Sequence, residues 1–94
     1  MSAGAILGAR LSAHARSEML RRGISAELVE AVLAAPEQRW PLRPGRDVVH
    51  SRVEMGSPAK LYLLRVIVDV DRAPAEVVTA YRTSKLDKYW RREP

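Results

Sequence analysis

Arginine and histidine side chains recur in three segments that have the residue pattern of β-strands, and they are the strongest candidates for chemistry. Guanidinium groups bind phosphate through two parallel hydrogen bonds and stay charged at any cellular pH. Imidazole titrates near neutrality and can transfer a proton. Together they suit binding of a phosphodiester and attack by a ribose 2′-hydroxyl, because charge then develops on the phosphoryl oxygens. The residues concerned are Arg46, His50, Arg52, Arg65 and Arg82.

The alternation of apolar and polar residues predicts that these side chains project from one face of an antiparallel sheet. Residues 46–55 alternate cleanly, whereas 60–70 and 76–83 are rich in valine, as is typical of strands with a buried face. Residues 56–59 and 71–74 contain the Gly, Ser, Asp and Pro that favour turns.

The lengths of the two turns decide which residues face each other. If both turns are tight, His50 lies opposite Arg65, and residues directly opposite share a face. Arg52 then lies opposite Leu63, which in turn faces Arg82 on the third strand. A slip of one residue in either turn would move all side chains of a strand to the other face.

Two helices are expected before this sheet. The first runs from an N-cap at Ser12 to Gly23, which suits the left-handed helix end. The second runs from a cap at Ser25 to Pro36, and a short edge strand over 38–42 can follow. The sequence therefore predicts an α+β fold in which two N-terminal helices pack on a curved antiparallel sheet of three to four strands.

The composition excludes several classes of protein. The 94 residues suffice for a single domain with one core, preceded by a flexible lead-in over residues 1–11. There is no Cys and there are only two His, so we expect no disulfide, no metal site and no cofactor. No apolar run approaches the length of a membrane span, and we expect a cytoplasmic protein. The net charge of +5 favours anionic partners, either nucleic acid or an acidic protein.

A second group of candidate residues comprises His14 and the end of the last strand. His14, near the start of the first helix, is either a proton-transfer group or an ordinary surface residue. The strand end offers a phenol, two hydroxyls and an ammonium group to a phosphate, or it only begins a terminal turn. These residues are Tyr81, Thr83, Ser84 and Lys85.

Several short motifs, taken together, resemble a family of small bacterial proteins. It is a domain-of-unknown-function family that is grouped by sequence with the RelE- and BrnT-like toxins. The resemblance covers residues 12–91. The motifs are His14-Ala15 with Met19, Arg22-Gly23-Ile24-Ser25, Val29 and Val32 before Pro36, Gly45-Arg46, Leu64-Arg65-Val66, Thr79-Ala80-Tyr81-Arg82-Thr83-Ser84-Lys85 and Tyr89-Trp90.

This resemblance implies a RelE/barnase-like fold and a metal-independent endoribonuclease that forms the toxin of a type II toxin–antitoxin pair. Its substrate would be mRNA or ribosome-associated RNA, and its partner a protein antitoxin. The general acid or base would be His14, which the resemblance implies, or His50, which the strand pattern places among the arginines. Arg46 and Arg65, both implied by the resemblance, would stabilise the transition state. The resemblance also implies a substrate-binding role for Tyr81 and for the hydroxyls and ammonium group that follow it; Arg52 and Arg82 join that set through the strand pattern.

Two alternatives to an enzyme remain open at the level of sequence. A non-catalytic basic module would bind nucleic acid or an acidic protein through the same arginines, with a steep dependence on salt. An interaction module would pair with another protein, or with itself as a homodimer, through its strand edges and through Trp40 and Trp90.

Overall fold

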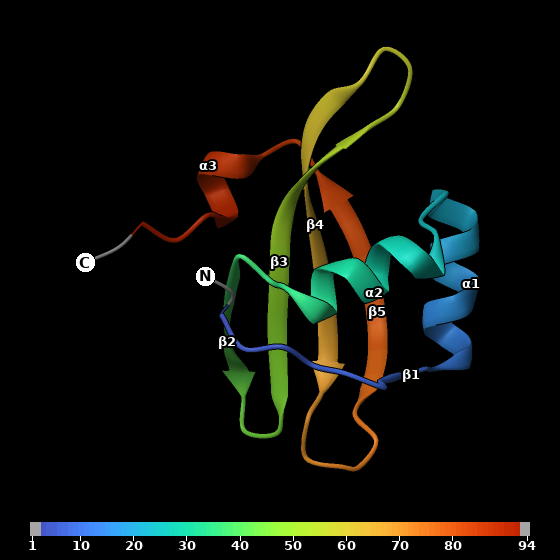
Figure 1. Cartoon of the computed structure of the whole chain (residues 1–94), viewed down its shortest axis with the longest axis vertical. Helices are drawn as coiled ribbons and strands as arrows, with labels where there is room; N and C mark the ends of the chain where they lie inside the picture. Colours follow the sequence, from blue (N-terminus) through green and yellow to red (C-terminus); the bar gives the residue numbers. More distant parts are fainter. Residues whose placement is uncertain (1–2, 93–94) are drawn as a thin grey trace.

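The computed structural model describes residues 3–92, and within them the chain forms three helices and a five-stranded sheet (Figure 1). In chain order the elements are β1 (Arg10–Leu11), α1 (Ala13–Arg22), α2 (Ala26–Ala34), β2 (Gln38–Arg43), β3 (Arg46–Met55), β4 (Lys60–Asp69), β5 (Glu76–Thr83) and α3 (Leu86–Tyr89).

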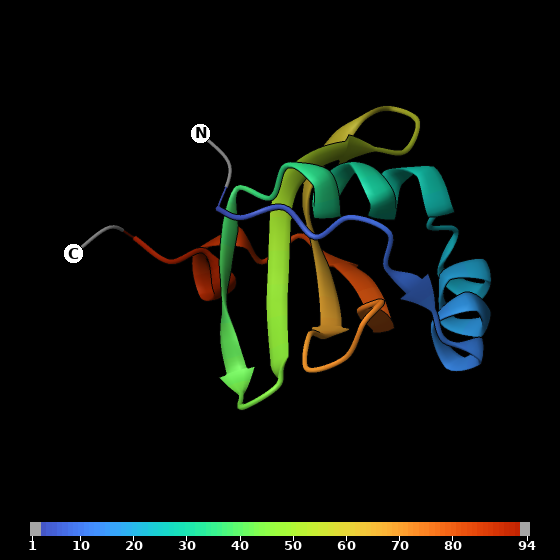
Figure 2. The same cartoon turned by 60° about the horizontal axis from the view of Figure 1, so that its bottom comes forward.

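The strands form one mixed sheet in the order β1-β5-β4-β3-β2. β1 pairs with β5 in parallel, and the other three pairs are antiparallel. In Figure 1, α2 crosses over the middle strands and α1 stands beside β5; Figure 2 shows α2 lying along one side of the sheet. The prediction of an α+β fold is therefore confirmed.

Local sequence explains both N-terminal helices. The Ser12 hydroxyl accepts a hydrogen bond of 3.0 Å from the amide of Ala15 and so caps α1. Gly23 ends α1 in the left-handed region, at φ +66°, where a residue without Cβ is favoured. The Ser25 hydroxyl caps α2 in the same way, by accepting a hydrogen bond of 3.1 Å from the amide of Leu28.

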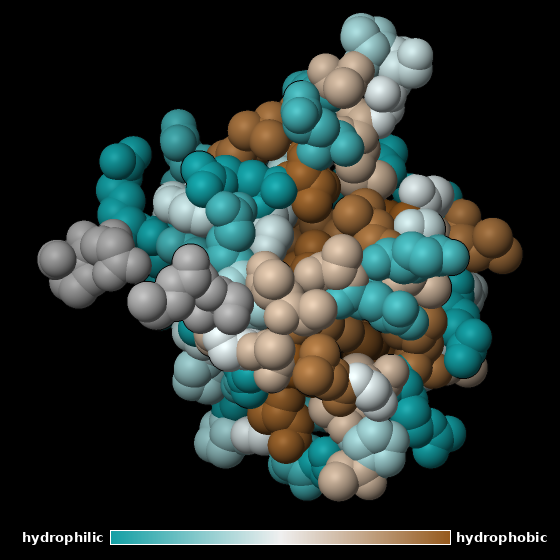
Figure 3. Space-filling model, in the orientation of Figure 1, coloured by the Kyte–Doolittle hydropathy of each residue, from teal (hydrophilic) through white to brown (hydrophobic). Residues whose placement is uncertain are grey.

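The core lies between the two helices and one face of the sheet, which we call the inner face. Apolar residues of the helices meet every second residue of the central strands there, as the periods of helix and strand require. The principal buried members are Ala15, Met19, Ile24, Val29, Val32, Leu33, Val49, Leu64, Val66, Val68, Val77 and Ala80. Seen from the side that carries α2, hydrophobic surface is interspersed between hydrophilic regions (Figure 3).

The register of the first strand pair is confirmed along its whole length. Met55 faces Lys60, His50 faces Arg65 and Arg52 faces Leu63. The tight turn between β3 and β4 therefore places His50 and Arg65 side by side on the sheet face opposite the core, which we call the outer face.

The register of the second pair is correct only next to its turn. Val68 faces Val77 as expected, but a bulge follows, and Ile67 faces Thr79. The extra residue shifts the rest of β5 by one position, so Arg82 lies opposite Leu64 rather than Leu63. The prediction that Arg82 shares a face with Arg65 is wrong for this reason.

The two predicted N-terminal helices are present as α1 and α2, but the sheet has more strands than the predicted three to four. Strand β2 occupies the place expected for the edge strand, but β1 adds a fifth strand and makes the sheet mixed. Residues 3–11 run beside α2 and β5, with backbone hydrogen bonds of 2.8 Å from Ile6 to Leu33 and from Arg10 to Ala75. Residues 1 and 2 of the expected flexible lead-in lie outside the described residues.

Candidate functional site

A buried histidine–arginine pair forms the centre of the outer face. His50 is 0% exposed and Arg65 is 5% exposed. The guanidinium of Arg65 donates to Nδ1 of His50 over 3.1 Å, and Nε2 of His50 lies 2.7 Å from Oε1 of Gln38. Because an arginine only donates, Nδ1 is the unprotonated nitrogen and Nε2 carries the hydrogen that Gln38 accepts. His50 is therefore held in one neutral tautomer.

The environment of His50 opposes its protonation. Burial first, and the nearby charge of Arg65 second, lower the pKa of His50 from 6.5 to about 4, whereas Glu37 acts in the opposite direction. A neutral imidazole is thus the stable form at physiological pH, and a proton can be accepted only after the site has become more hydrated.

This depressed pKa predicts that the folded protein loses stability in mild acid. The unfolded chain takes up a proton near pH 6.5, whereas the folded chain does so only near pH 4. The stabilisation is therefore complete above pH 6.5 and is lost as the pH falls towards 4. We expect the free energy of unfolding to be about 2 kcal/mol lower at pH 5 than at pH 7.5, measured by urea denaturation.

The His50→Gln variant is the control for this pH dependence, because its amide does not titrate. Its stability should be nearly independent of pH between 7.5 and 5. Hydrogen bonds from arginines lower the pKa values of Glu18, Glu37 and Asp69, so these carboxylates lose their contribution at lower pH than His50 does. An equal slope in the wild type and in His50→Gln would contradict the assignment.

Arg65 lies among aromatic rings instead of carboxylates. Its guanidinium carbon is 4.3 Å from the ring centre of Tyr89, 5.8 Å from Trp40 and 5.9 Å from Tyr81. No ion pair joins Arg65 to a carboxylate within residues 3–92, and its buried Nε has no hydrogen-bond partner. A buried cation whose partners are aromatic rings and one neutral imidazole has unused capacity to bind an anion.

The end of the chain covers this pair. We call residues 86–92 the C-terminal strap; it contains α3, which lies beside β2 and β3 in Figure 1. The ring of Trp90 stacks on His50 with centroids 5.7 Å apart and an angle of 18°. Oε1 of Gln38 accepts a 3.0 Å hydrogen bond from the amide of Arg91, and its amide group donates to the Arg91 carbonyl. The strap is thus attached to the same Gln38 that orients His50.

Arg52 joins the same group from the rim of the outer face. It forms two hydrogen bonds with Glu37, of 2.7 and 3.1 Å, and its guanidinium carbon lies 4.4 Å from the ring centre of Trp90. The side chain is about half exposed. Arg52 therefore supports the strap and is an accessible cation at the rim of the site.

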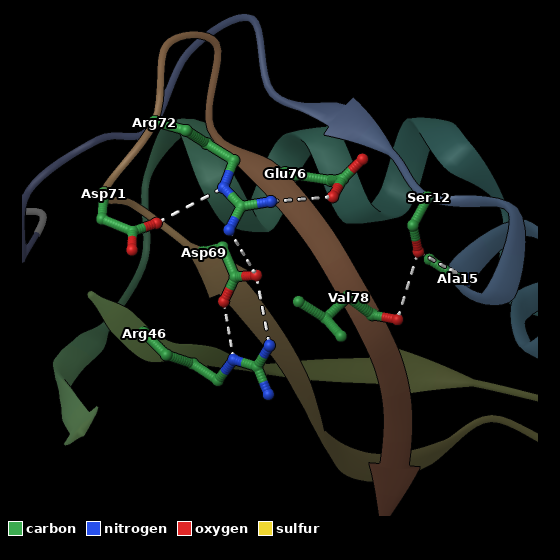
Figure 4. A network of polar contacts seen from close by, with 8 residues as sticks. All are labelled: Ser12, Ala15, Arg46, Asp69, Asp71, Arg72, Glu76 and Val78. Atoms are coloured by element: carbon green, nitrogen blue, oxygen red, sulfur yellow. Dashed lines mark hydrogen bonds and ion pairs between the residues drawn. The ribbon is translucent and has the colours of Figure 1, made fainter. Parts of the chain in front are cut away.

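Arg46 belongs to a different cluster at the other end of the sheet. Its guanidinium pairs with Asp69, at 2.6 and 3.1 Å, and Arg72 contacts the same carboxylate at 3.4 Å (Figure 4). The register pairs Arg46 with Asp69 as well. The charge of Arg46 is thus compensated by a structural ion pair. Arg46 also lies four residues from His50 along β3.

The remaining candidates are dispersed. Tyr81 faces Arg65 on the outer face, whereas His14 is exposed on α1. The guanidinium of Arg82 donates a hydrogen bond of 2.9 Å to the carbonyl of Arg22 at the end of α1. Thr83 is the last residue of β5, and Ser84 and Lys85 link this strand to α3. The Thr83 hydroxyl accepts a hydrogen bond of 3.1 Å from the amide of Lys85.

The strand pattern predicts that His50, Arg52 and Arg65 lie together, but it does not predict the residues that enclose them. Trp40 and Trp90 are expected only as part of a protein-interaction surface. Gln38 and Trp40 come from β2, the strand next to His50, whereas Tyr89 and Trp90 come from the strap, which is distant from His50 along the chain. A local signal is the spacing of Leu86 and Trp90 by four residues, which is compatible either with a short helix or with an irregular segment. Nothing in the sequence indicated the face on which that helix lies.

The described residues limit other kinds of site. Among residues 3–92, no group of three His, Asp or Glu side chains is arranged so that it could hold a metal ion. In the same range, no helix has the length and apolar character needed to cross a bilayer.

Comparison with known proteins identifies a family for most of the chain. No curated protein and no solved structure matches it significantly. A family model described as a domain of unknown function, DUF4258, matches residues 11–82. The matched part contains His50, Arg65 and Arg52 and ends before the C-terminal strap. The chain therefore belongs to the DUF4258 family.

Proposed function

We propose that the outer face binds RNA and that the protein is a metal-independent endoribonuclease of the kind found as the toxin of a type II toxin–antitoxin pair. The observation that carries the proposal is the buried guanidinium of Arg65, which has an unpartnered Nε and no carboxylate partner within residues 3–92. A phosphodiester would supply the missing negative charge and an acceptor. The arrangement of two N-terminal helices on a sheet supports a relation to the RelE- and BrnT-like toxins.

The proposed reaction uses the two residues at the centre of the face. His50 accepts the proton of a ribose 2′-hydroxyl, whose oxygen attacks the adjacent phosphorus. Arg65 stabilises the negative charge that develops on the phosphoryl oxygens. The bond to the 5′-oxygen breaks, and that oxygen takes back the proton from the imidazole, leaving a 2′,3′-cyclic phosphate and a 5′-hydroxyl. The C-terminal strap must first leave His50, because that side chain is 0% exposed.

The proposal predicts that the purified protein cleaves RNA in the presence of EDTA and slows growth when it is expressed. Both effects should fall at least about a hundredfold in His50→Ala and Arg65→Ala, because each removes a group that acts in the transition state. Products are identified by their cyclic phosphate ends. His14→Ala is the matched control, since His14 lies on α1, away from the outer face. Unchanged cleavage in both outer-face variants would overturn the assignment.

A non-catalytic RNA-binding or protein-binding module is the second candidate, and the state of His50 favours it. Its neutral form is stabilised by a pKa of about 4, so it is a poor base while the strap is in place. Such a module would bind RNA with a steep dependence on salt and cleave none of it. Co-purification of an acidic antitoxin that slows hydrogen exchange at the Arg65 guanidinium would favour the toxin hypothesis instead.

A further inference from the structure

A second basic hollow lies between the end of α1 and the C-terminal half of β5. Its volume is about 410 Å³, and it is lined by Arg21, Arg22, Tyr81 and Arg82. Three of these four residues are arginines, and they come from two elements that are far apart in sequence. The one-residue shift at the β5 bulge allows this arrangement, because it turns Arg82 away from the outer face and towards α1.

The charges of this hollow are only partly neutralised. Both oxygens of Glu18 are occupied, one by Arg21 at 2.6 Å and the other by Arg22 at 2.8 Å. Arg82 forms no ion pair within residues 3–92 and uses one nitrogen to reach the carbonyl of Arg22, at 2.9 Å. Three guanidinium groups therefore share a single carboxylate, and Arg82 keeps donors that no anion satisfies.

Tyr81 connects the hollow with the outer face. It lines the hollow, and its ring centre also lies 5.9 Å from the guanidinium carbon of Arg65. The strand register pairs Tyr81 with Arg65 as well. A single aromatic ring thus separates two groups of arginines, and bases of single-stranded nucleic acid commonly stack on such a ring between phosphate contacts.

We propose that the hollow lined by Arg21, Arg22 and Arg82 binds a phosphate of single-stranded RNA, next to the phosphate bound by Arg65. The inference rests on the proposed function and adds a second contact to it. A strand lying across Tyr81 would place one phosphate on each side of the ring. Guanidinium groups with free donors suit the bidentate recognition of phosphate.

The first test measures binding of a ten-nucleotide oligouridylate by fluorescence anisotropy over a range of salt concentrations. Arg82→Gln should weaken binding about fivefold and reduce the slope of log K against log salt by about 0.7, the value for one phosphate contact to a single strand. Arg16→Gln removes the same charge from an exposed position of α1 and should leave the slope unchanged. A dinucleotide with one phosphate should bind wild type and Arg82→Gln equally.

The second test changes the carboxylate instead of an arginine. Glu18→Gln frees Arg21 and Arg22 from their ion pairs and should tighten oligouridylate binding about threefold, with a steeper salt dependence. Glu30→Gln removes the same charge from an exposed position of α2 and should change binding by less than about 1.5-fold, because screening weakens distant charges.

The outcomes separate this inference from the proposed function. If Arg82→Gln binds oligouridylate like Arg16→Gln while Arg65→Met has lost binding, the second contact is wrong and the outer-face site stands. If the wild type binds no oligouridylate, both are wrong. If Arg82→Gln loses affinity for a polyglutamate peptide but not for RNA, the hollow is a docking site for an acidic protein and the inference is overturned.

Discussion

Replacing Trp90 with alanine should raise the pKa of His50 from about 4 towards its ordinary value and increase the affinity for RNA. Burial is the largest cause of the depressed pKa, and the stacked indole of Trp90 supplies part of that burial. Water that reaches the ring will stabilise the imidazolium. The same water-filled space becomes available to a phosphate at Arg65, so we expect binding of oligouridylate to tighten about tenfold. NMR titration of the imidazole measures the pKa directly.

Lys88→Ala is the matched control for the Trp90 variant. Lys88 is an exposed residue of α3, so its loss removes a side chain of the C-terminal strap without uncovering the histidine. The pKa of His50 should then remain near 4. If Trp90→Ala also leaves it near 4, the strap does not control the hydration of His50, and the requirement for strap movement is wrong.

Arg65→Met should have opposite effects on stability and on binding. Removing the guanidinium eliminates the desolvation penalty of a buried cation without a carboxylate partner, which is several kcal/mol. The substitution also leaves Nδ1 of His50 without a hydrogen-bond donor, which costs about 1–3 kcal/mol. We expect the free energy of unfolding to stay equal or to rise by about 1 kcal/mol. Affinity for oligouridylate should fall at least about tenfold, since the central phosphate contact is lost.

Two variants set the scale for this result. Leu64→Ala, in the adjacent and fully buried core position, should cost about 3 kcal/mol through the cavity that it leaves. Arg52→Met removes a half-exposed arginine that is already paired with Glu37, so affinity should fall only about twofold. A loss of stability in Arg65→Met as large as that in Leu64→Ala would show that the buried cation is compensated after all.

The helices and the first hairpin could be predicted because their determinants are local. Ser12, Gly23 and Ser25 specify helix ends within a few residues, and the short turn before Lys60 fixes the pairing of His50 with Arg65. Such signals depend on the chemistry of one turn of chain, so they can be read without knowledge of the tertiary structure.

The second register could not be predicted beyond the bulge of β5. The turn gave the correct pairing of Val68 with Val77, but the extra residue after Val77 has no distinctive side chain that marks a bulge. β1 was missed for a related reason: two residues are too few to show an alternation, and their partner Glu76 lies far away in the sequence.

The candidate site could be predicted only as far as its two neighbouring strands. His50, Arg52 and Arg65 follow from alternation, whereas the enclosure by Trp90 and the clamp by Gln38 depend on long-range packing. The sequence also contains no sign that His50 is buried, because a polar residue on a sheet face with a polar pattern is ordinarily exposed to solvent.

The two outer strands of the sheet have a consequence for how copies of this protein behave at high concentration. β2 contains Pro41, which has no amide hydrogen to offer to another strand, and it also contains the charged residues Arg39 and Arg43. β1 at the opposite side has only two residues. Edges of this kind are poor templates for adding a strand from a second molecule. We therefore expect little tendency to form amyloid-like fibrils from the native state, in spite of the valine-rich strands at the centre of the sheet.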